Sequence, residues 1–118
     1  MSLHDLLLPF GDLYDSIAAA YQHLEERQRS TPAEDNKIRA VIVLTDGEDT
    51  ASKMQLQDLL NRVRFDGEQR TIRVFTIAYG KDAKRDILSN IAEATQAKSY
   101  IGNPQNIVGV FRDISTFF

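Results

Sequence analysis

The sequence predicts an α/β fold: a three-layer, Rossmann-like parallel sheet of about three strands flanked by helices, in the order α-β-α-β-α-β-α. Residues 39–45 and 72–78 are nearly continuous apolar runs rich in β-branched side chains, without the alternation of a sheet that has one wet face. Around them, apolar residues recur at three- and four-residue steps, which is the spacing of helices with one buried face. Strands that alternate with helices need crossover connections, so we expect a parallel sheet with helices on both faces.

The first helix is expected from Leu13 to about Arg29, and the polar segment 30–36 with its proline ends it. Its predicted buried stripe is Leu13, Ile17, Ala20, Tyr21 and Leu24. The first strand, residues 39–45, follows, and the second strand is residues 72–78. Because both runs are apolar throughout, we expect nearly full burial of Val43, Leu44, Val74, Phe75 and Ile77.

A second helix is predicted between the strands, from about Lys53 to Arg64, capped by Thr50 or Ser52. Its buried face would carry Met54, Leu56, Leu59, Leu60 and Val63. A turn at Asp66-Gly67 then leads into the second strand.

The carboxyl-terminal third continues the alternation. A third helix should begin at Asp82 or Lys84 and run to about Thr95, and a short third strand is expected at 98–101. The last helix should span 105–117, with Ile107, Val108, Phe111, Ile114 and Phe118 facing inward.

The amino-acid composition limits the classes of protein to which the chain can belong. The 118 residues are 42% apolar and 26% charged, which is typical of one globular domain. The net charge of −3 disfavours nucleic acid as a partner, and no apolar run is long enough for membrane insertion in this segment. Cysteine is absent, which excludes disulfides and thiolate chemistry but leaves the localisation unknown, either cytoplasmic or exported.

The first strand ends in a cluster of oxygen-bearing side chains, and this is the strongest functional signal. Thr45, Asp46, Gly47, Glu48 and Asp49 follow the apolar run directly. Ligands of open α/β sheets bind beyond the carboxyl ends of the strands, and carboxylates there suit Mg²⁺ or Mn²⁺. Asp46 is therefore the candidate metal ligand, although a turn-capping role is the alternative. Thr45, Gly47, Glu48 and Asp49 are candidate partner-binding residues, with helix capping and solvation as the alternative for the two acidic ones.

Four segments together resemble the von Willebrand factor type A (VWA) domains, in the style of bacterial members. They are Val41–Thr50 with its Thr-Asp-Gly, the strand Ile72–Gly80, the pattern Ile87-Leu88-x-x-Ile91-Ala92-x-Ala94-Thr95, and Leu13–Ala20 with its Leu-Tyr-Asp. The resemblance covers the chain from about Leu13 onward. It divides the chain into a leader or expression-derived segment, 1–12, and a partial VWA-like α/β domain, 13–118.

The chain also departs from that family. Its members hold a metal through an Asp-x-Ser-x-Ser loop, a Thr before the Leu-Tyr-Asp helix, and the Asp of Thr-Asp-Gly. Only Asp46 is matched here, and Pro9-Phe10-Gly11-Asp12 stands where the Thr would be. The resemblance therefore implies the carboxyl-terminal half of such a domain with an incomplete metal-ion-dependent adhesion site. We expect no bound cofactor in this chain, and Mg²⁺ or Mn²⁺ only in a complete domain.

The function that the resemblance implies is noncatalytic: a protein-binding module for adhesion or complex assembly, whose protein partner the sequence does not identify. The alternative is a receiver-like phosphoacceptor or a metal-dependent hydrolase that uses Asp46, with Lys81 past the second strand. That alternative lacks an acidic pair after another strand and a Gly-rich phosphate loop.

The strand 40–45 is also the predicted edge of the sheet, because the strand that neighbours it in the family resembled is not found in the sequence. An apolar strand edge is a template for pairing with a second chain, so we expect a homodimer through residues 40–45. The apolar segment Leu6–Phe10 is the rival cover for that edge.

Overall fold

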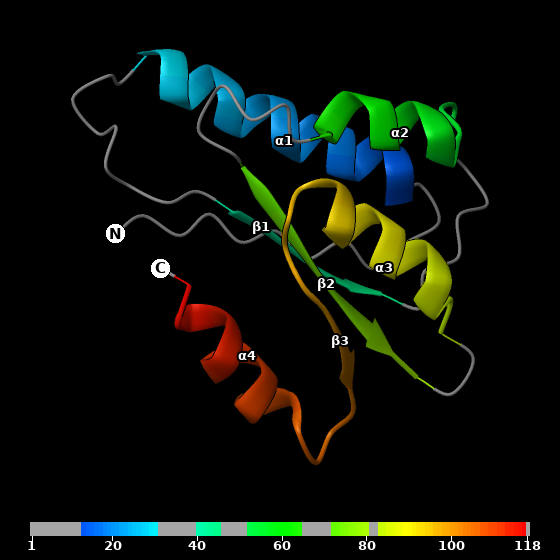
Figure 1. Ribbon diagram of the computed structural model, residues 1–118, viewed down its shortest axis with the longest axis vertical. Coiled ribbons are helices and arrows are strands. Elements are labelled where there is room, and N and C mark those ends of the chain that lie inside the picture. Colours follow the sequence, from blue (N-terminus) through cyan, green and yellow to red (C-terminus); the bar gives the residue numbers. More distant parts are fainter. Residues whose placement is uncertain (1–12, 31–39, 46–51, 65–71, 81–82, 118) are drawn as a thin grey trace.

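The computed structural model describes residues 13–30, 40–45, 52–64, 72–80 and 83–117. Helices and strands alternate as α-β-α-β-α-β-α, which confirms the predicted fold (Figure 1). The elements are α1 (Leu13–Ser30), β1 (Ala40–Thr45), α2 (Leu56–Val63), β2 (Arg73–Tyr79), α3 (Arg85–Ala94), β3 (Ser99–Gly102) and α4 (Ile107–Ser115). No described helix has the length and apolar character needed to cross a membrane.

The strands form a parallel sheet in the order β1-β2-β3. Thr45 pairs with Ala78, and Tyr79 pairs with Gly102, so the carboxyl ends of all three strands meet at one edge. The starts of α1, α2 and α3 lie at the same end of the molecule (Figure 1). Within the described ranges, β1 is an edge strand that pairs with β2 alone.

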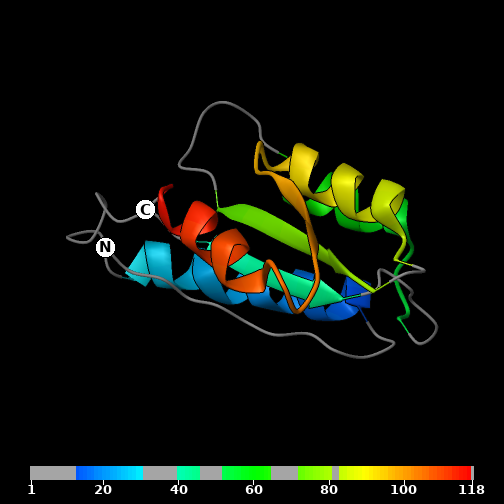
Figure 2. The ribbon, with the colours of Figure 1, turned by 90° about the horizontal axis from the view of Figure 1, so that it is seen from below.

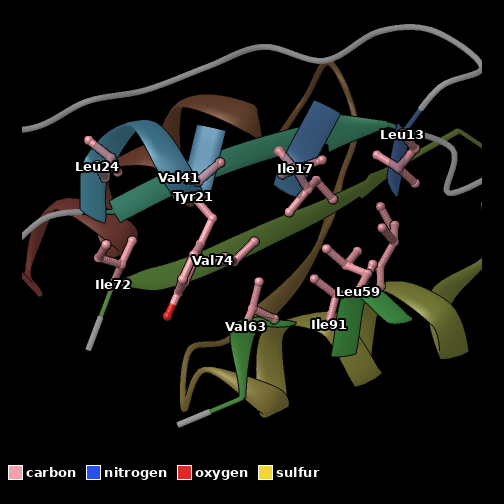
Figure 3. Packing of buried hydrophobic residues seen from close by; sticks show 13 residues of the cluster. Leu13, Ile17, Tyr21, Leu24, Val41, Leu59, Val63, Ile72, Val74 and Ile91 are labelled. Carbon is pink, nitrogen blue, oxygen red and sulfur yellow. The ribbon is translucent and has the colours of Figure 1, made fainter. Parts of the chain in front are cut away.

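One face of the sheet is covered by α1, α2 and α3. Side chains from α1 point toward Val41 and Val74 on the strands, and Leu59, Val63 and Ile91 approach from α2 and α3 (Figure 3). The buried cluster on this face is Leu13, Ile17, Tyr21, Leu24, Val41, Val43, Leu59, Val63, Ile72, Val74, Ala78, Leu88 and Ile91. Periodic apolar stripes on three helices thus close the face as predicted.

The opposite face is covered by α4, which lies across the sheet from α2 and α3 (Figure 2). A smaller buried cluster joins it to the strands: Ala40, Ile42, Phe75, Ile77, Val110 and Ile114. Because successive strand residues point to opposite faces and both faces are covered, the strands need apolar side chains at nearly every position. This explains the continuous apolar runs in the sequence.

Three predictions about burial on the α4 face need correction. Leu44 is half-buried, not fully buried, and packs at the margin of the smaller cluster. Val108 and Phe111 were expected to face inward, but they are 67% and 37% exposed. The inward stripe of α4 is Ile107, Val110 and Ile114, and a short helix that touches the sheet along one stripe leaves its neighbouring stripe in water. Phe118 lies outside the described residues.

Buried hydroxyl groups fasten α3 to the sheet. The Thr95 hydroxyl accepts a hydrogen bond from the Val74 amide (2.9 Å) and donates to the Ala92 carbonyl (3.0 Å). The Thr76 hydroxyl donates to the Leu88 carbonyl at 3.0 Å. Both threonines are fully buried, so each needs such partners to offset the loss of water. These hydrogen bonds fix the position of α3 along β2.

Candidate functional site

The predicted site lies at the carboxyl edge of the sheet, where β1 ends at Thr45. The Thr45 side chain is 7% exposed, so it offers a partner little direct contact area. Asp46, Gly47, Glu48 and Asp49 lie outside the described residues, as does Thr50. Their predicted roles in binding a metal or a partner therefore stay predictions.

Asp15, in the first turn of α1, holds the segment that follows these residues. One carboxylate oxygen of Asp15 accepts a hydrogen bond from the Lys53 amide (2.8 Å) and the other accepts one from the Met54 amide (3.1 Å). The Asp15 amide donates to the Ser52 hydroxyl at 2.9 Å. Charge-assisted bonds to backbone amides are among the stronger hydrogen bonds in proteins. Asp15 therefore ties residues 52–54 to the start of α1.

This arrangement corrects the predicted start of the second helix. α2 begins at Leu56, and its first turn is closed by the Asp58 carboxylate, which accepts a hydrogen bond from the Gln55 amide at 3.1 Å. Ser52 does not cap α2, because the N-cap position is Gln55, three residues later. The Ser52 hydroxyl instead accepts a hydrogen bond from the backbone amide of Asp15, 37 residues away in sequence.

The described residues at this edge do not by themselves fit a divalent metal ion. Nowhere in the described ranges do three or more His, Cys, Asp or Glu residues gather as a metal site would require. The nearby carboxylate of Asp15 already uses both oxygens on backbone amides. Mg²⁺ prefers six oxygen ligands in near-octahedral geometry, so Asp46 would need donors beyond those described.

A pocket of about 310 Å³ opens at the same edge, beside the ends of β2 and β3. Its lining is largely apolar and comes from the ends of both strands, the start of α3 and the turn before α4. The lining residues are Tyr79, Gly80, Arg85, Ile101, Gly102, Asn103 and Pro104. Because β1, β2 and β3 are neighbours, this pocket lies within about two strand spacings, roughly 10 Å, of the end of β1.

The floor of the pocket depends on two glycines. Gly80 has φ +108°, a conformation that other residues adopt only with strain. A Cβ on Gly102 would lie 2.7 Å from the Ile77 Cγ2 atom and 3.3 Å from the Ile107 Cδ1 atom, so a larger residue there would require these side chains to shift. Gly80 has open space around its Cα, and the constraint there is the backbone conformation alone.

Asn103 fixes the wall on the α4 side. Its side-chain oxygen accepts hydrogen bonds from the amides of Gln105 and Asn106, each at 2.9 Å. The Asn106 side chain in turn donates to the Ile101 carbonyl (3.0 Å) and accepts from the Asn103 amide (2.8 Å). An Asn followed by Pro is a common way to begin a helical turn. The turn is thus held by its own side chains and needs no ligand to shape it.

The sequence profile of the von Willebrand factor type A domain matches residues 11–108, which is most of the chain. This chain belongs to the VWA domain family. The match includes α1, all three strands and the whole of the edge just described. No curated protein matches the chain. VWA domains are typically protein-binding modules.

The hydrogen-bonding role of Asp15 and the pocket position of Arg85 and Ile101 were not predicted from the sequence of this VWA domain. Asp15 was noticed only as part of a family motif, and nothing local reveals bonds to a segment 38 residues later. Ile101 was assigned to a short third strand with no role in a site, and it is 52% exposed. The sequence offered one indication of the pocket: Arg85 and Ile101 lie near predicted strand ends, where α/β folds bind ligands.

Proposed function

We propose that this VWA domain is a noncatalytic binding module for adhesion or complex assembly, and that it meets its protein partner at the carboxyl edge of the sheet. The observation that carries the proposal is the hydrogen bonding of the Lys53 and Met54 amides to Asp15, at the end of the molecule where the strands end. Gly47, Glu48 and Asp49 are the proposed contact residues, whereas Thr45, which is 7% exposed at the end of β1, adds little contact area of its own.

The proposal includes an incomplete metal site. Asp46 is the matched family ligand, and we propose that the chain alone binds Mg²⁺ and Mn²⁺ weakly or not at all. A ligand that binds the native state raises the melting temperature. Millimolar Mg²⁺ should therefore leave the melting curve unmoved. An upward shift that is present in the wild type and absent in Asp46→Ala would overturn this part of the proposal.

The proposed contact surface is tested by changing its residues and measuring binding. Proteins retained by the immobilised domain are purified first, and each is then assayed for one-to-one binding to the domain. Glu48→Ala with Asp49→Ala should weaken that binding, whereas Arg112→Ala, on exposed α4 away from the edge, should not. Binding that responds to Arg112→Ala and ignores the edge variants would place the partner elsewhere and contradict the proposal.

The catalytic alternative makes an opposite prediction. A receiver-like phosphoacceptor would take up phosphate from acetyl phosphate in the presence of Mg²⁺, and Asp46→Asn would abolish the uptake. We expect no acyl phosphate on the protein after such treatment, measured by intact mass. Stoichiometric uptake that depends on Asp46 would replace the binding-module proposal with the enzymatic one.

A homodimer through β1 is the last part of the proposal. What supports it is the backbone, because β1 pairs on one side only within the described part of the chain. The side chains of Ala40, Val41, Ile42 and Val43 are at most 3% exposed, so they add little apolar surface for a second copy to cover. Light scattering at high micromolar concentration tests it, and Ile42→Pro should dissociate or unfold a dimer by removing a ladder donor. A strict monomer ends this part.

A further inference from the structure

The geometry points to residues 3–8 of this chain as a further strand of the sheet, parallel to β1 and paired with its free edge. The inference goes beyond the proposed function, because it assigns the edge of β1 and not the loop that follows it. Residues 3–8 lie outside the described part of the chain, and what assigns them to this edge is the geometry of β1 and α1 together with the sequence. They compete with a second copy for the same edge, so they are the alternative to the proposed homodimer.

The alternation of hydrogen bonds identifies the backbone groups of β1 that face the free edge. The Thr76 amide of β2 donates to the carbonyl of Lys98, next to β3, at 3.4 Å, so Thr76 bonds toward β3. Successive residues of a strand bond to opposite sides, so Phe75 bonds toward β1. Phase alternates between partners in a parallel pair, and Ile42, the partner of Phe75, therefore points its N–H and C=O away from β2. The outward-facing backbone groups of β1 are those of Ala40, Ile42 and Leu44.

The outward groups at the start of β1 are shielded from water. Ala40 is 0% exposed and Ile42 is 3% exposed. Buried backbone N–H and C=O groups are nearly always hydrogen-bonded, yet within the described ranges β1 pairs with β2 alone. The two residues therefore need a partner from outside those ranges. A single copy of the chain already buries them, which favours a segment of the same chain over a second copy.

The position of α1 determines on which side of β1 a preceding strand lies. α1, α2 and α3 cover the same face of the sheet (Figure 3). α2 connects β1 to β2 and α3 connects β2 to β3, so both crossovers move across the sheet in the same direction. Parallel crossovers are right-handed in about 98% of cases, and a fixed hand on a fixed face gives a fixed direction. A strand joined to β1 through α1 therefore lies on the side of β1 away from β2, which is the free edge.

The residues before α1 have the length and the side chains that such a strand needs. α1 begins at the end of the molecule where the strands end, so a strand that enters it through a short turn runs parallel to β1 (Figure 1). Residues 103–106 connect β3 to α4, and connections of about two to six residues are usual there. The same spacing before Leu13 makes Pro9-Phe10-Gly11-Asp12 the turn and ends the strand at Leu8. Residues 3–8 then equal β1 in length, and the three leucines that end them supply apolar side chains to both faces.

Nuclear magnetic resonance on the full chain, labelled with ¹⁵N and ¹³C, tests the pairing. We expect nuclear Overhauser contacts between the backbone protons of residues 3–8 and those of Ile42 and Leu44, in the pattern of a parallel pair. An equal mixture of labelled and unlabelled chains, with isotope filtering, separates contacts within one molecule from contacts between two. The Ile42 amide should also exchange with solvent at least about tenfold more slowly than in an unstructured peptide, because it is hydrogen-bonded.

Proline variants of the full chain test the ladder. Successive N–H groups of a strand point to opposite sides, so only one of Leu6→Pro and Leu7→Pro removes a donor to β1. That variant should speed exchange of the Ile42 amide by at least about tenfold, and the other should have a smaller effect. Ser2→Pro, outside the proposed strand, is the control and should change the rate by less than about threefold. The Thr76 amide, which bonds on the far side of β2, reports whether the rest of the sheet stays folded.

Exchange of the Ile42 amide at the unprotected rate, or no contact between residues 3–8 and β1 in the wild type, would overturn the inference even if the proline variants fail to fold. Equal effects of all three prolines in folded variants would show that the segment does not pair as a strand. Contacts to β1 found only between different molecules would also overturn it, and contacts from one β1 to another would support the homodimer instead. The binding test with Glu48 and Asp49 is separate, because it measures affinity for a purified partner.

Discussion

The two faces of the sheet contain the same kind of side chain but are covered unequally. On the face beneath α1, α2 and α3, apolar stripes from all three helices meet the strands in one large cluster. On the other, α4 is the helix that the described residues provide, and Leu44, Val108 and Phe111 remain partly or largely exposed beside it. The first face is therefore expected to carry most of the stability, while the second has more freedom to adjust. Paired substitutions on the two faces test this difference.

The largest loss is expected from Ile91→Ala on α3. Ile91 is fully buried in the cluster that α1, α2 and α3 enclose, and its neighbours are held from several sides. The cavity left by the truncation cannot collapse easily, so unfolding by urea should become easier by about 2–5 kcal/mol. A change below 1 kcal/mol would mean that this face is not the rigid one.

Ile114→Ala on α4 is the matched change on the other face and should cost less, about 2 kcal/mol. Ile114 is 1% exposed, so the side chain itself is as well buried as Ile91. The expected loss of stability is smaller because α4 can move toward the sheet and fill part of the cavity left by the truncation. Chemical denaturation of the two variants side by side measures it. Equal or greater loss for Ile114→Ala would break the comparison.

Thr95→Val tests the hydrogen bonds that fasten α3. The valine keeps the shape of the side chain but leaves the buried Val74 amide without its side-chain acceptor. We expect a loss of about 1–2 kcal/mol, the usual cost of one buried unsatisfied donor. Thr116→Val is the control: its hydroxyl bonds to the Asp113 carbonyl on the exposed end of α4, so its removal should change the denaturation midpoint little.

Tyr100→Phe should have a smaller and pH-dependent effect. Partial burial, followed by the hydrogen bond that the phenol donates to Asp113, raises the pKa of Tyr100 above its ordinary value near 10. A raised pKa means that the stabilisation is complete below the unfolded pKa and declines as the pH rises above it. The stability difference between wild type and variant, measured by urea titration, should therefore be constant from pH 7 to about 9 and shrink above about 10. A difference that grows with pH contradicts this link between β3 and α4.

The smallest effect is expected from Val108→Ser. Because Val108 is 67% exposed, its replacement should change the free energy of unfolding by less than about 0.5 kcal/mol. Val110→Ser, two residues along the same helix and 8% exposed, is the sensitive counterpart. If Val108→Ser destabilises as strongly as Val110→Ser, then α4 packs through a wider face than the structure shows.

The sequence by itself determined which segments are helices and strands and that the sheet is parallel. Two kinds of local pattern made this possible. The apolar runs at 39–45 and 72–78 indicate strands covered on both faces, and helical stripes such as that of α1 indicate one buried face of a helix. The family was also visible in the sequence, since its motifs are short strings of neighbouring residues. Periodicity placed Ile114 correctly but misplaced Val108 and Phe111, because an apolar residue in a helix does not reveal how wide its partner surface is.

Only the tertiary structure decided how the carboxyl edge is built. Asp15 meets Ser52, Lys53 and Met54 because α1 and the segment before α2 start at the same end of the sheet, and no pattern within either segment encodes that meeting. The pocket joins Tyr79, Gly80 and Arg85 to residues 101–104 for the same reason: adjacent parallel strands end side by side. Interactions between near neighbours in the sequence determine whether a segment is a helix or a strand. A site assembled from several strand ends depends also on the order and register of the strands, and these are established only when the sheet packs.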